Sequence, residues 1–200
     1  MNKSRLEAFS DGVFAIIITI MVLELKVPDG ASVAALKPLL PVFGSYVLSF
    51  IFVAIYWVNH HHLMHTLKRV NSRVMWANMH LLFWLSLIPF VTGWMGVNNF
   101  NKLTVAIYGC VPILSGIAYT ILSNEICRTY KEQTPLTRAI AKSNVKAVWS
   151  TVLYAAAIPC ALYIHPAVSA VLFVSVSVMW LIPSKDIENA LNDELTSLIL

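Results

Sequence analysis

Six long apolar stretches, separated by short polar segments, are the feature that most constrains this chain. A helix needs about 20 mostly apolar residues to cross a hydrocarbon core of roughly 30 Å. Stretches near this length cover residues 9–25, 39–57, 74–97, 103–123, 145–164 and 167–182. Because backbone groups facing lipid must be hydrogen-bonded within their own segment, we expect all six to be helices. The sequence therefore predicts an all-α membrane protein with six transmembrane helices per subunit.

The last of these stretches is the weakest candidate for a membrane span. Pro166 and Pro183 bracket it and leave 16 residues between them. At a rise of 1.5 Å per residue, this corresponds to roughly 24 Å, which is short for a full crossing. The residue before a proline is biased away from helical backbone, so His165 and Pro166 are expected to form a tight turn.

Composition supports the membrane class and excludes several others. Hydrophobic residues make up 58% of the 200 residues and charged residues only 12%, so a soluble globule of this size could not bury its apolar surface. Few charges, placed between long apolar runs, argue against a nucleic-acid partner. Three cysteines without motif spacing indicate buried thiols. The sequence contains no catalytic triad pattern and no phosphate-binding glycine loop, which argues against an enzyme.

Lys and Arg residues are distributed unevenly among the polar segments. With the N-terminus placed inside, the inner segments hold eleven of the 14 basic residues and the outer segments three. Basic loops favour the cytoplasmic side, so both termini are predicted to be cytoplasmic. We divide the chain into a six-helix transmembrane channel domain, 1–183, and a short amphipathic cytoplasmic helix, 184–200. The apolar face of this C-terminal helix consists of Ile187, Leu191, Leu195 and Leu198.

Asp11 is an acidic residue within, or at the inner edge of, the first apolar stretch. Placing an ionisable side chain in a membrane costs free energy, so such a residue is taken first as a candidate functional residue. At 100° per residue, an apolar stripe with one hydroxyl falls within about 80° of a single line. Its members are Phe9, Gly12, Ile16, Thr19, Ile20 and Leu23. Asp11 points sideways from this stripe and Ser10 nearly opposite to it. By rotation alone, the pattern is explained by an ordinary packing helix in which Arg5, from another turn or from another chain, neutralises Asp11.

Motifs in the first three spans carry a resemblance to a known family. The first helix contains Arg5-x-x-x-Phe9-Ser10-Asp11, then Ala15-Ile16-x-x-Thr19 and Leu23-Glu24. The second span contains Tyr56-Trp57-Val58-Asn59-His60-His61. The third contains Asn78-x-x-Leu81-Leu82-Phe83 and Leu85-Ser86-x-x-Pro89-Phe90. These motifs resemble the transmembrane protein 175 family of lysosomal potassium channels and their prokaryotic relatives. The likeness covers three spans in detail and the whole chain in span count.

The resemblance implies a potassium-selective cation channel, in the prokaryotic single-repeat form that assembles as a homotetramer. It implies a central pore lined by first helices, with Ile16 as the main hydrophobic constriction and Thr19 one turn further out. Ile20 and Leu23 would form further apolar rings. The family has no re-entrant filter. In this sequence the string nearest to such a filter, residues 92–96, lacks its pattern and is expected to be a glycine-loosened helix end.

The resemblance also implies a polar network that holds helices and subunits together. The residues it assigns to this network are Arg5, Phe9, Ser10, Asp11, Trp57 and His60. The implied partners are further copies of the chain, the lipid bilayer, and potassium and other monovalent cations. No cofactor beyond the permeant potassium ion is implied, and the implied location is the prokaryotic plasma membrane.

Two other functions stay open for this sequence. A proton-coupled secondary transporter would use Asp11 and His60 to carry protons, and a non-conducting membrane scaffold would use neither for transport. A channel conducts in discrete steps, a transporter gives saturable flux without steps, and a scaffold gives neither. These behaviours separate the three hypotheses.

Two groups of polar residues at the ends of the first two spans also have alternative interpretations. His61 and His65 are four residues apart, which matches metal-ligand spacing on a helix. No acidic residue or cysteine lies near them in sequence, so we expect hydrogen bonding at a helix end and no metal. Glu24 is expected either to concentrate cations at an outer mouth or to pair with Lys26 or Lys37.

Overall fold

The chain forms an elongated bundle of helices. The computed structural model describes residues 2–130 and 134–181, and every regular element in these ranges is helical. The α-helices are α1 (Lys3–Leu23), α2 (Val33–Leu36), α3 (Leu40–His65), α4 (Ser72–Ser86), α5 (Ile88–Val97), α6 (Lys102–Cys127), α7 (Pro135–Pro159) and α8 (Pro166–Leu181). Two short segments of other helical types, η1 (Lys37–Leu39) and η2 (Cys160–Ile164), join α2 to α3 and extend α7.

Five continuous helical segments are long and apolar enough to cross a membrane. They are Lys3–Leu23, Val33–His65, Ser72–Val97, Lys102–Cys127 and Thr137–Ile164. The sixth apolar helix, α8, has 16 residues and is shorter than these. The predicted all-α membrane class is therefore confirmed, including the weakness of the last span. The predicted C-terminal helix, 184–200, lies outside the described residues.

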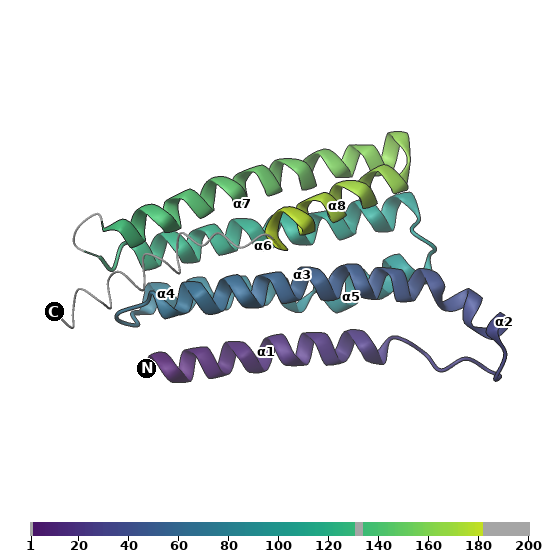
Figure 1. The fold of residues 1–200 in the computed structure, drawn as a ribbon, viewed down its shortest axis with the longest axis horizontal. Coiled ribbons are helices and arrows are strands. Elements are labelled where there is room, and N and C mark those ends of the chain that lie inside the picture. The colour runs from purple at the N-terminus through teal and green to yellow at the C-terminus, as the bar shows by residue number, and fades with distance from the viewer. Residues whose placement is uncertain (1, 131–133, 182–200) are drawn as a thin grey trace.

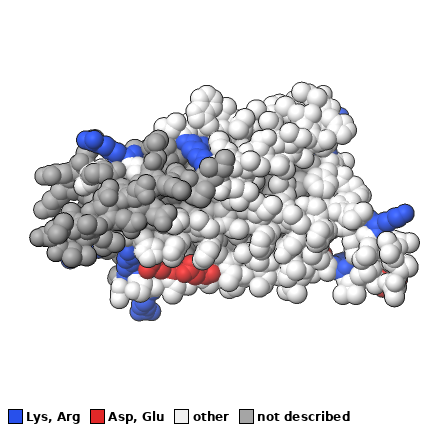
Figure 2. Space-filling model, viewed as in Figure 1, with Lys and Arg blue, Asp and Glu red and all other residues white. Residues whose placement is uncertain are grey.

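The helices lie side by side along the long axis of the molecule (Figure 1). α1 is at one edge and packs against α3, α4 and α5. α6 packs against α4 and α7, and α8 covers part of α7. On the face drawn in Figure 2, Lys and Arg side chains lie at the right-hand end and over the left half, a row of Asp and Glu side chains extends from the left toward the middle, and the part of the surface between these groups and the right-hand end is uncharged. This distribution matches a bundle whose middle lies in lipid and whose ends meet water.

Local sequence signals explain where several helices begin. Asn2, Asn71 and Asn101 each stand before a helix, and the side-chain oxygen of each accepts a backbone N–H of the first turn. Thr134 and Thr137 form a reciprocal capping box at the start of α7. Such caps satisfy N–H groups that have no partner within the helix. In the middle of a helix the backbone N–H groups are already hydrogen-bonded within the helix, so Asn or Thr has no capping role there.

Prolines explain where the helical ladder is interrupted. Pro89 has no backbone N–H, and the third span breaks at Leu87 into α4 and α5. Pro159 precedes the wider π-type turn of η2. His165 has extended backbone, as expected before Pro166, and its Nδ1 accepts the N–H of Ala167 at 3.2 Å. The predicted tight turn between α7 and α8 is therefore present.

Gly96 marks a close approach between α5 and α3. An ideal Cβ at this position would lie 2.4 Å from Ser45 Oγ and 2.8 Å from the Cα of Val42. Both distances are shorter than a van der Waals contact, so a glycine is required where the two backbones meet. Residues 92–96 form the last part of α5, so the expected helix end is present at this string. Gly96 serves close packing there and does not loosen the helix.

Candidate functional site

The two faces of α1 have opposite surroundings. Leu6, Ser10, Phe14, Ile17 and Met21 are buried against the bundle. The opposite side, which we call the exposed face of α1, comprises Phe9, Gly12, Ile16, Thr19, Ile20 and Leu23. Ile16 is 57% exposed and its neighbour Ile17 only 2%. The predicted stripe is thus an apolar surface that this chain leaves uncovered in the described residues.

Thr19 supplies a polar group on the exposed face of α1. Its hydroxyl donates to the backbone oxygen of Ile16 at 2.9 Å. Because the hydrogen is used within the helix, the hydroxyl oxygen keeps lone pairs that can accept a hydrogen bond or contact a cation. The face therefore presents an acceptor oxygen one turn beyond the isoleucine side chain.

Asp11 is held by an indole on the neighbouring helix. The Nε1–H of Trp57, on α3, donates to Oδ1 of Asp11 at 2.9 Å. Arg5 is exposed and has no hydrogen bond or ion pair with any residue that the structure describes. The hypothesis that Arg5 neutralises Asp11 within one subunit is therefore wrong. A hydrogen bond between helices, formed 46 positions apart in sequence, takes that place.

A second polar contact joins three helices inside the bundle. His60 on α3 lies with Nε2 2.7 Å from Oδ1 of Asn78 on α4, and the amide nitrogen of Asn78 donates to Ser10 Oγ at 3.0 Å. Ser10 in turn donates to the backbone oxygen of Leu6. An amide oxygen only accepts, so His60 carries its hydrogen on Nε2 in this contact. The three side chains are almost fully buried, and their hydrogen bonds satisfy one another.

The structure brings together some of the predicted network residues and separates others. Ser10 and Asp11 contact α4 and α3 through the two interactions above, and Trp57 and His60 supply the α3 side. Phe9 is 52% exposed and lies with Ile16 on the exposed face of α1, outside the network of its own subunit. Asn78 also belongs to this network, although the prediction from the sequence did not include it. Its amide inside an apolar span, at the start of the motif Asn78-x-x-Leu81-Leu82-Phe83, was the signal that could have identified it.

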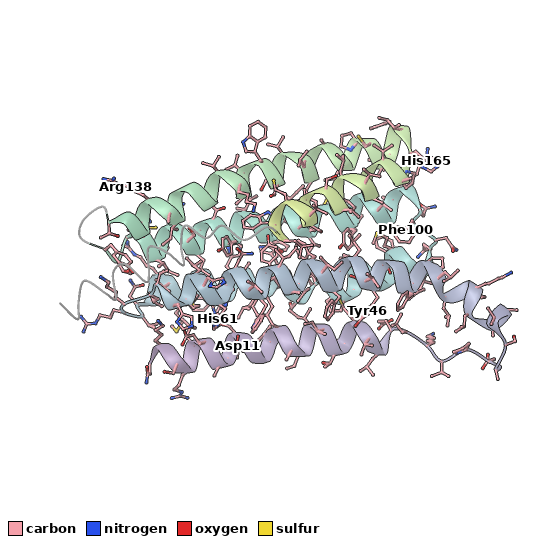
Figure 3. All side chains as sticks on the ribbon, viewed as in Figure 1. Asp11, Tyr46, His61, Phe100, Arg138 and His165 are labelled. Atoms are coloured by element: carbon pink, nitrogen blue, oxygen red, sulfur yellow. The ribbon has the colours of Figure 1, made fainter. Side chains whose placement is uncertain are left out.

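The histidines at the end of α3 pack with aromatic rings. The rings of His61 and His65 are 4.4 Å apart between centroids in an edge-to-face arrangement, and His61 stacks on Trp57. Asp11 and His61 lie on adjacent helices near the end of the molecule where the chain begins (Figure 3). Among the described residues, no group of three or more His, Cys, Asp or Glu could hold a metal ion. Lys3 Nζ donates to the backbone oxygen of His65, which ties the start of α1 to the end of α3.

Glu24, at the other end of α1, leans toward α5. An ideal Cβ on Gly93 would lie 3.5 Å from Oε2 of Glu24. Lys26 and Lys37 are both within the described residues, and neither forms an ion pair with Glu24 there. An ion pair of Glu24 with Lys26 or Lys37, one of the two predicted alternatives, is therefore not found among the described residues. The Glu24 side chain is exposed.

Comparison with known proteins identifies the family. A family model described as "endosomal/lysosomal potassium channel TMEM175" matches residues 5–89. A protein named potassium channel from Chryseobacterium sp. (strain P1-3) is 52% identical over 193 residues, which cover 96% of this chain and 100% of that protein. The chain belongs to the TMEM175 family. The resemblance inferred from the three motifs is confirmed.

More distant TMEM175 relatives share parts of the chain. A protein named potassium channel from Streptomyces collinus is 35% identical over 138 residues, covering 64% of this chain and 67% of that protein. Human TMEM175, named an endosomal/lysosomal proton channel, is 36% identical over 96 residues, or 42% of this chain and 19% of its own. The crystal structure of a TMEM175 homologue from Chamaesiphon minutus, described as lysosomal potassium-selective, has a TM-score of 0.78 at 24% identity. It covers 89% of this chain and 95% of that one, which shows the shared fold.

The matched family range includes the whole site of this TMEM175 member. Residues 5–89 include the exposed face of α1, both polar contacts and the break before Pro89. The helices from α6 onward lie outside that range. The family match of this integral membrane protein therefore covers α1, α3 and α4, the helices that form the two polar contacts described above.

Proposed function

We propose that this TMEM175 family member is a potassium-selective cation channel, with a pore lined by the exposed faces of α1 helices in a homotetramer. The observation that carries the proposal is the uncovered apolar face of α1, with Ile16 57% and Leu23 78% exposed. A spanning helix at the edge of its subunit can face a symmetry axis. The names of the bacterial relatives, potassium channel, support the same function.

In this arrangement, four copies of Ile16 form the hydrophobic constriction. Close apolar side chains exclude water and stop ions, and hydrated ions pass when the side chains move apart. Thr19 would place a ring of hydroxyl oxygens one turn further out, where they replace part of the hydration shell of potassium. Ile20 and Leu23 would form further apolar rings toward the outer end. No re-entrant filter is needed in this arrangement.

The polar contacts fix the rotation of α1 in this proposal. Trp57 and Asp11 hold one side of the helix, and the buried Ser10, Asn78 and His60 hold the side opposite to Ile16. Arg5 and Phe9 are exposed, so their assembly role would be exercised between subunits.

The remaining assignments follow from charge and chemistry. With eleven of 14 basic residues on the side of the N-terminus, we place both termini in the cytoplasm of a prokaryotic cell and the spans in its plasma membrane. Ion permeation makes and breaks no covalent bond, so neither catalysis nor a cofactor is part of this function. We assign the channel to residues 1–183.

The reversal potential of the purified protein in a planar bilayer tests this function. Under opposed potassium and sodium gradients, we expect single-channel steps and a reversal potential that follows potassium. A separate proton gradient is included because the animal relatives are named proton channels. Saturable flux without steps would favour the transporter based on Asp11 and His60, and no flux would favour a scaffold. Asp11 and His60 have different hydrogen-bond partners, Trp57 and Asn78, which argues against direct proton exchange between them.

A further inference from the structure

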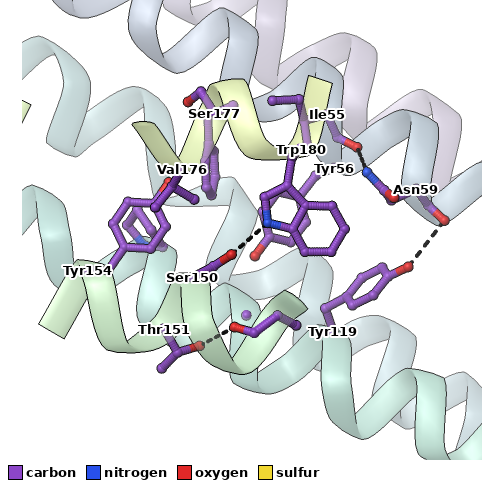
Figure 4. A pocket seen from close by; sticks show the side chains of 14 residues that line it. Ile55, Tyr56, Asn59, Tyr119, Ser150, Thr151, Tyr154, Val176, Ser177 and Trp180 are labelled. Carbon is purple, nitrogen blue, oxygen red and sulfur yellow. Dashed lines mark hydrogen bonds between the residues drawn. The ribbon is translucent and has the colours of Figure 1, made fainter. Parts of the chain in front are cut away.

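A small cavity lies away from the exposed face of α1, among α3, α6, α7 and α8 (Figure 4). Its volume is about 40 Å³. Its walls are mostly apolar and aromatic, and no charged side chain lines it among the described residues. Since one water needs about 10–15 Å³ on this scale, the cavity has room for a few polar atoms and a short piece of alkyl chain.

Two tyrosine hydroxyls that line this cavity have no hydrogen-bond partner among the described residues. They belong to Tyr56 on α3 and Tyr154 on α7. Other polar groups in the wall are satisfied: Tyr119, for example, donates to the backbone oxygen of Asn59 at 3.3 Å. The Tyr56 hydroxyl lies 3.7 Å from an ideal Cβ on Gly116, so the absent glycine side chain leaves space beside it. The cavity therefore offers two unused uncharged donors.

The cavity lies in the middle of the membrane-spanning bundle. Ser150 lines it and accepts the indole N–H of Trp180 at 2.7 Å. From Ser150, each end of the α7 and η2 segment is about 22 Å away at 1.5 Å per residue. α8 begins beside the end of this segment and stops part-way along it, with Trp180 as its penultimate residue (Figure 1). At this depth an occupant would enter from the hydrocarbon core.

We propose that this cavity binds the polar end of an uncharged amphiphile from the bilayer, an alkyl chain that carries a hydroxyl or an ester carbonyl. The two free phenol groups hydrogen-bond to such an oxygen, and the aromatic walls contact the adjacent methylene groups. A carboxylate or ammonium group would be left without a counter-charge among the lining residues, and burying an unpaired charge is costly. The alkyl tail extends into lipid, since the cavity is too small for the whole molecule.

Photolabelling of the full chain in lipid nanodiscs tests this site with a diazirine-bearing octanol as the probe. After illumination, mass spectrometry is expected to find label on the α3 and α7 peptides that contain Tyr56 and Tyr154, and excess 1-octanol to displace it. Octyl acetate in place of octanol distinguishes a carbonyl acceptor from a hydroxyl ligand. The double variant Tyr56→Phe and Tyr154→Phe should lower labelling of these peptides by about 30-fold, the scale of two lost neutral hydrogen bonds.

Tyr163→Phe is the matched control, because Tyr163 is 83% exposed outside the cavity, and it should leave the labelling unchanged. Uniform labelling of lipid-facing helices, or label that neither octanol nor octyl acetate displaces, would overturn the proposal and leave a cavity for water. Gly116→Ala, which only adds a methyl group beside Tyr56, gives a second test and should also reduce labelling. None of these readouts uses ion flow, so the site stands or falls independently of the channel.

Discussion

α1 and α6 are both apolar membrane-spanning helices of nearly the same mean hydropathy, but they differ in how much of their surface is buried inside the subunit. In the most apolar part of α1, 28% of residues are buried inside the subunit, against 56% for α6. α6 lies between α4 and α7, whereas α1 packs at the edge with one face uncovered. Hydropathy thus identifies a spanning helix, and only packing shows whether a face is left for another partner.

The sharpest test of this contrast uses two adjacent isoleucines on α1. Ile17→Asn places an amide in a packed, apolar site, and we expect it to lower the free energy of unfolding by about 3–5 kcal/mol. Ile16→Asn changes an exposed side chain, and we expect a change within about 0.5 kcal/mol. Thermal unfolding of the two purified variants measures the difference. In the bilayer, Ile16→Asn should wet the constriction and increase sodium permeation.

Equal destabilisation by these two substitutions would contradict the assignment of the exposed face of α1. Unchanged conduction and selectivity in Ile16→Asn would contradict the pore constriction while leaving the two-faced helix intact.

Shortening a buried side chain of α6 should cause the next largest loss of stability. Leu122 is fully buried, and Leu122→Ala should lower the free energy of unfolding by about 2–4 kcal/mol because it leaves a cavity. Ile121→Ala is the control, since Ile121 is the neighbouring exposed residue on the same helix. Denaturation in mixed detergent reports both values. If the two variants unfolded alike, α6 would not be the buried counterpart of α1.

Breaking the buried contact between His60, Asn78 and Ser10 should lower the free energy of unfolding by less than the truncation of Leu122. Asn78→Ala leaves the buried Ser10 hydroxyl and the His60 ring without their common partner, which should destabilise the fold by about 1–3 kcal/mol. Asn98→Ala removes an amide that bonds only to its own helix at an exposed site, and should change stability far less. Thermal unfolding and the recovery of assembled protein by size-exclusion chromatography are the readouts. A stable, fully assembled Asn78→Ala variant would show that this contact does not hold α1 in place.

The smallest effect is expected at the exposed contact between α1 and α3. Trp57→Phe removes the donor to Asp11 and keeps most of the aromatic surface, so we expect a loss of about 0.5–1.5 kcal/mol. Trp149→Phe serves as control because that indole is exposed and makes no hydrogen bond among the described residues. Chemical cross-linking followed by electrophoresis should show fewer assembled subunits for Trp57→Phe. Equal assembly of the two variants would limit the Asp11 contact to a role within one subunit.

The sequence predicted the membrane class, the family and the two faces of α1. Those features depend on spacing along one segment: apolar length sets a span, and a rotation of 100° per residue sets a face. The burial of Ser10 and the exposure of Ile16 agree with that rotation. Tetramer formation, the cytoplasmic termini and the roles of the pore residues stay predictions.

Only the tertiary structure decided which groups meet. Asp11 is paired with Trp57, and Ser10 with Asn78, across 46 and 68 positions of sequence. Helical periodicity is silent about such contacts, because it fixes the direction of a side chain and not the helix that lies in that direction. Gly96 is a further example. The backbone of α3 lies within 2.8 Å of the position that a Cβ on Gly96 would take, so only glycine fits there. The contacts that hold α1 therefore come from the order in which the helices pack, a property of the whole bundle.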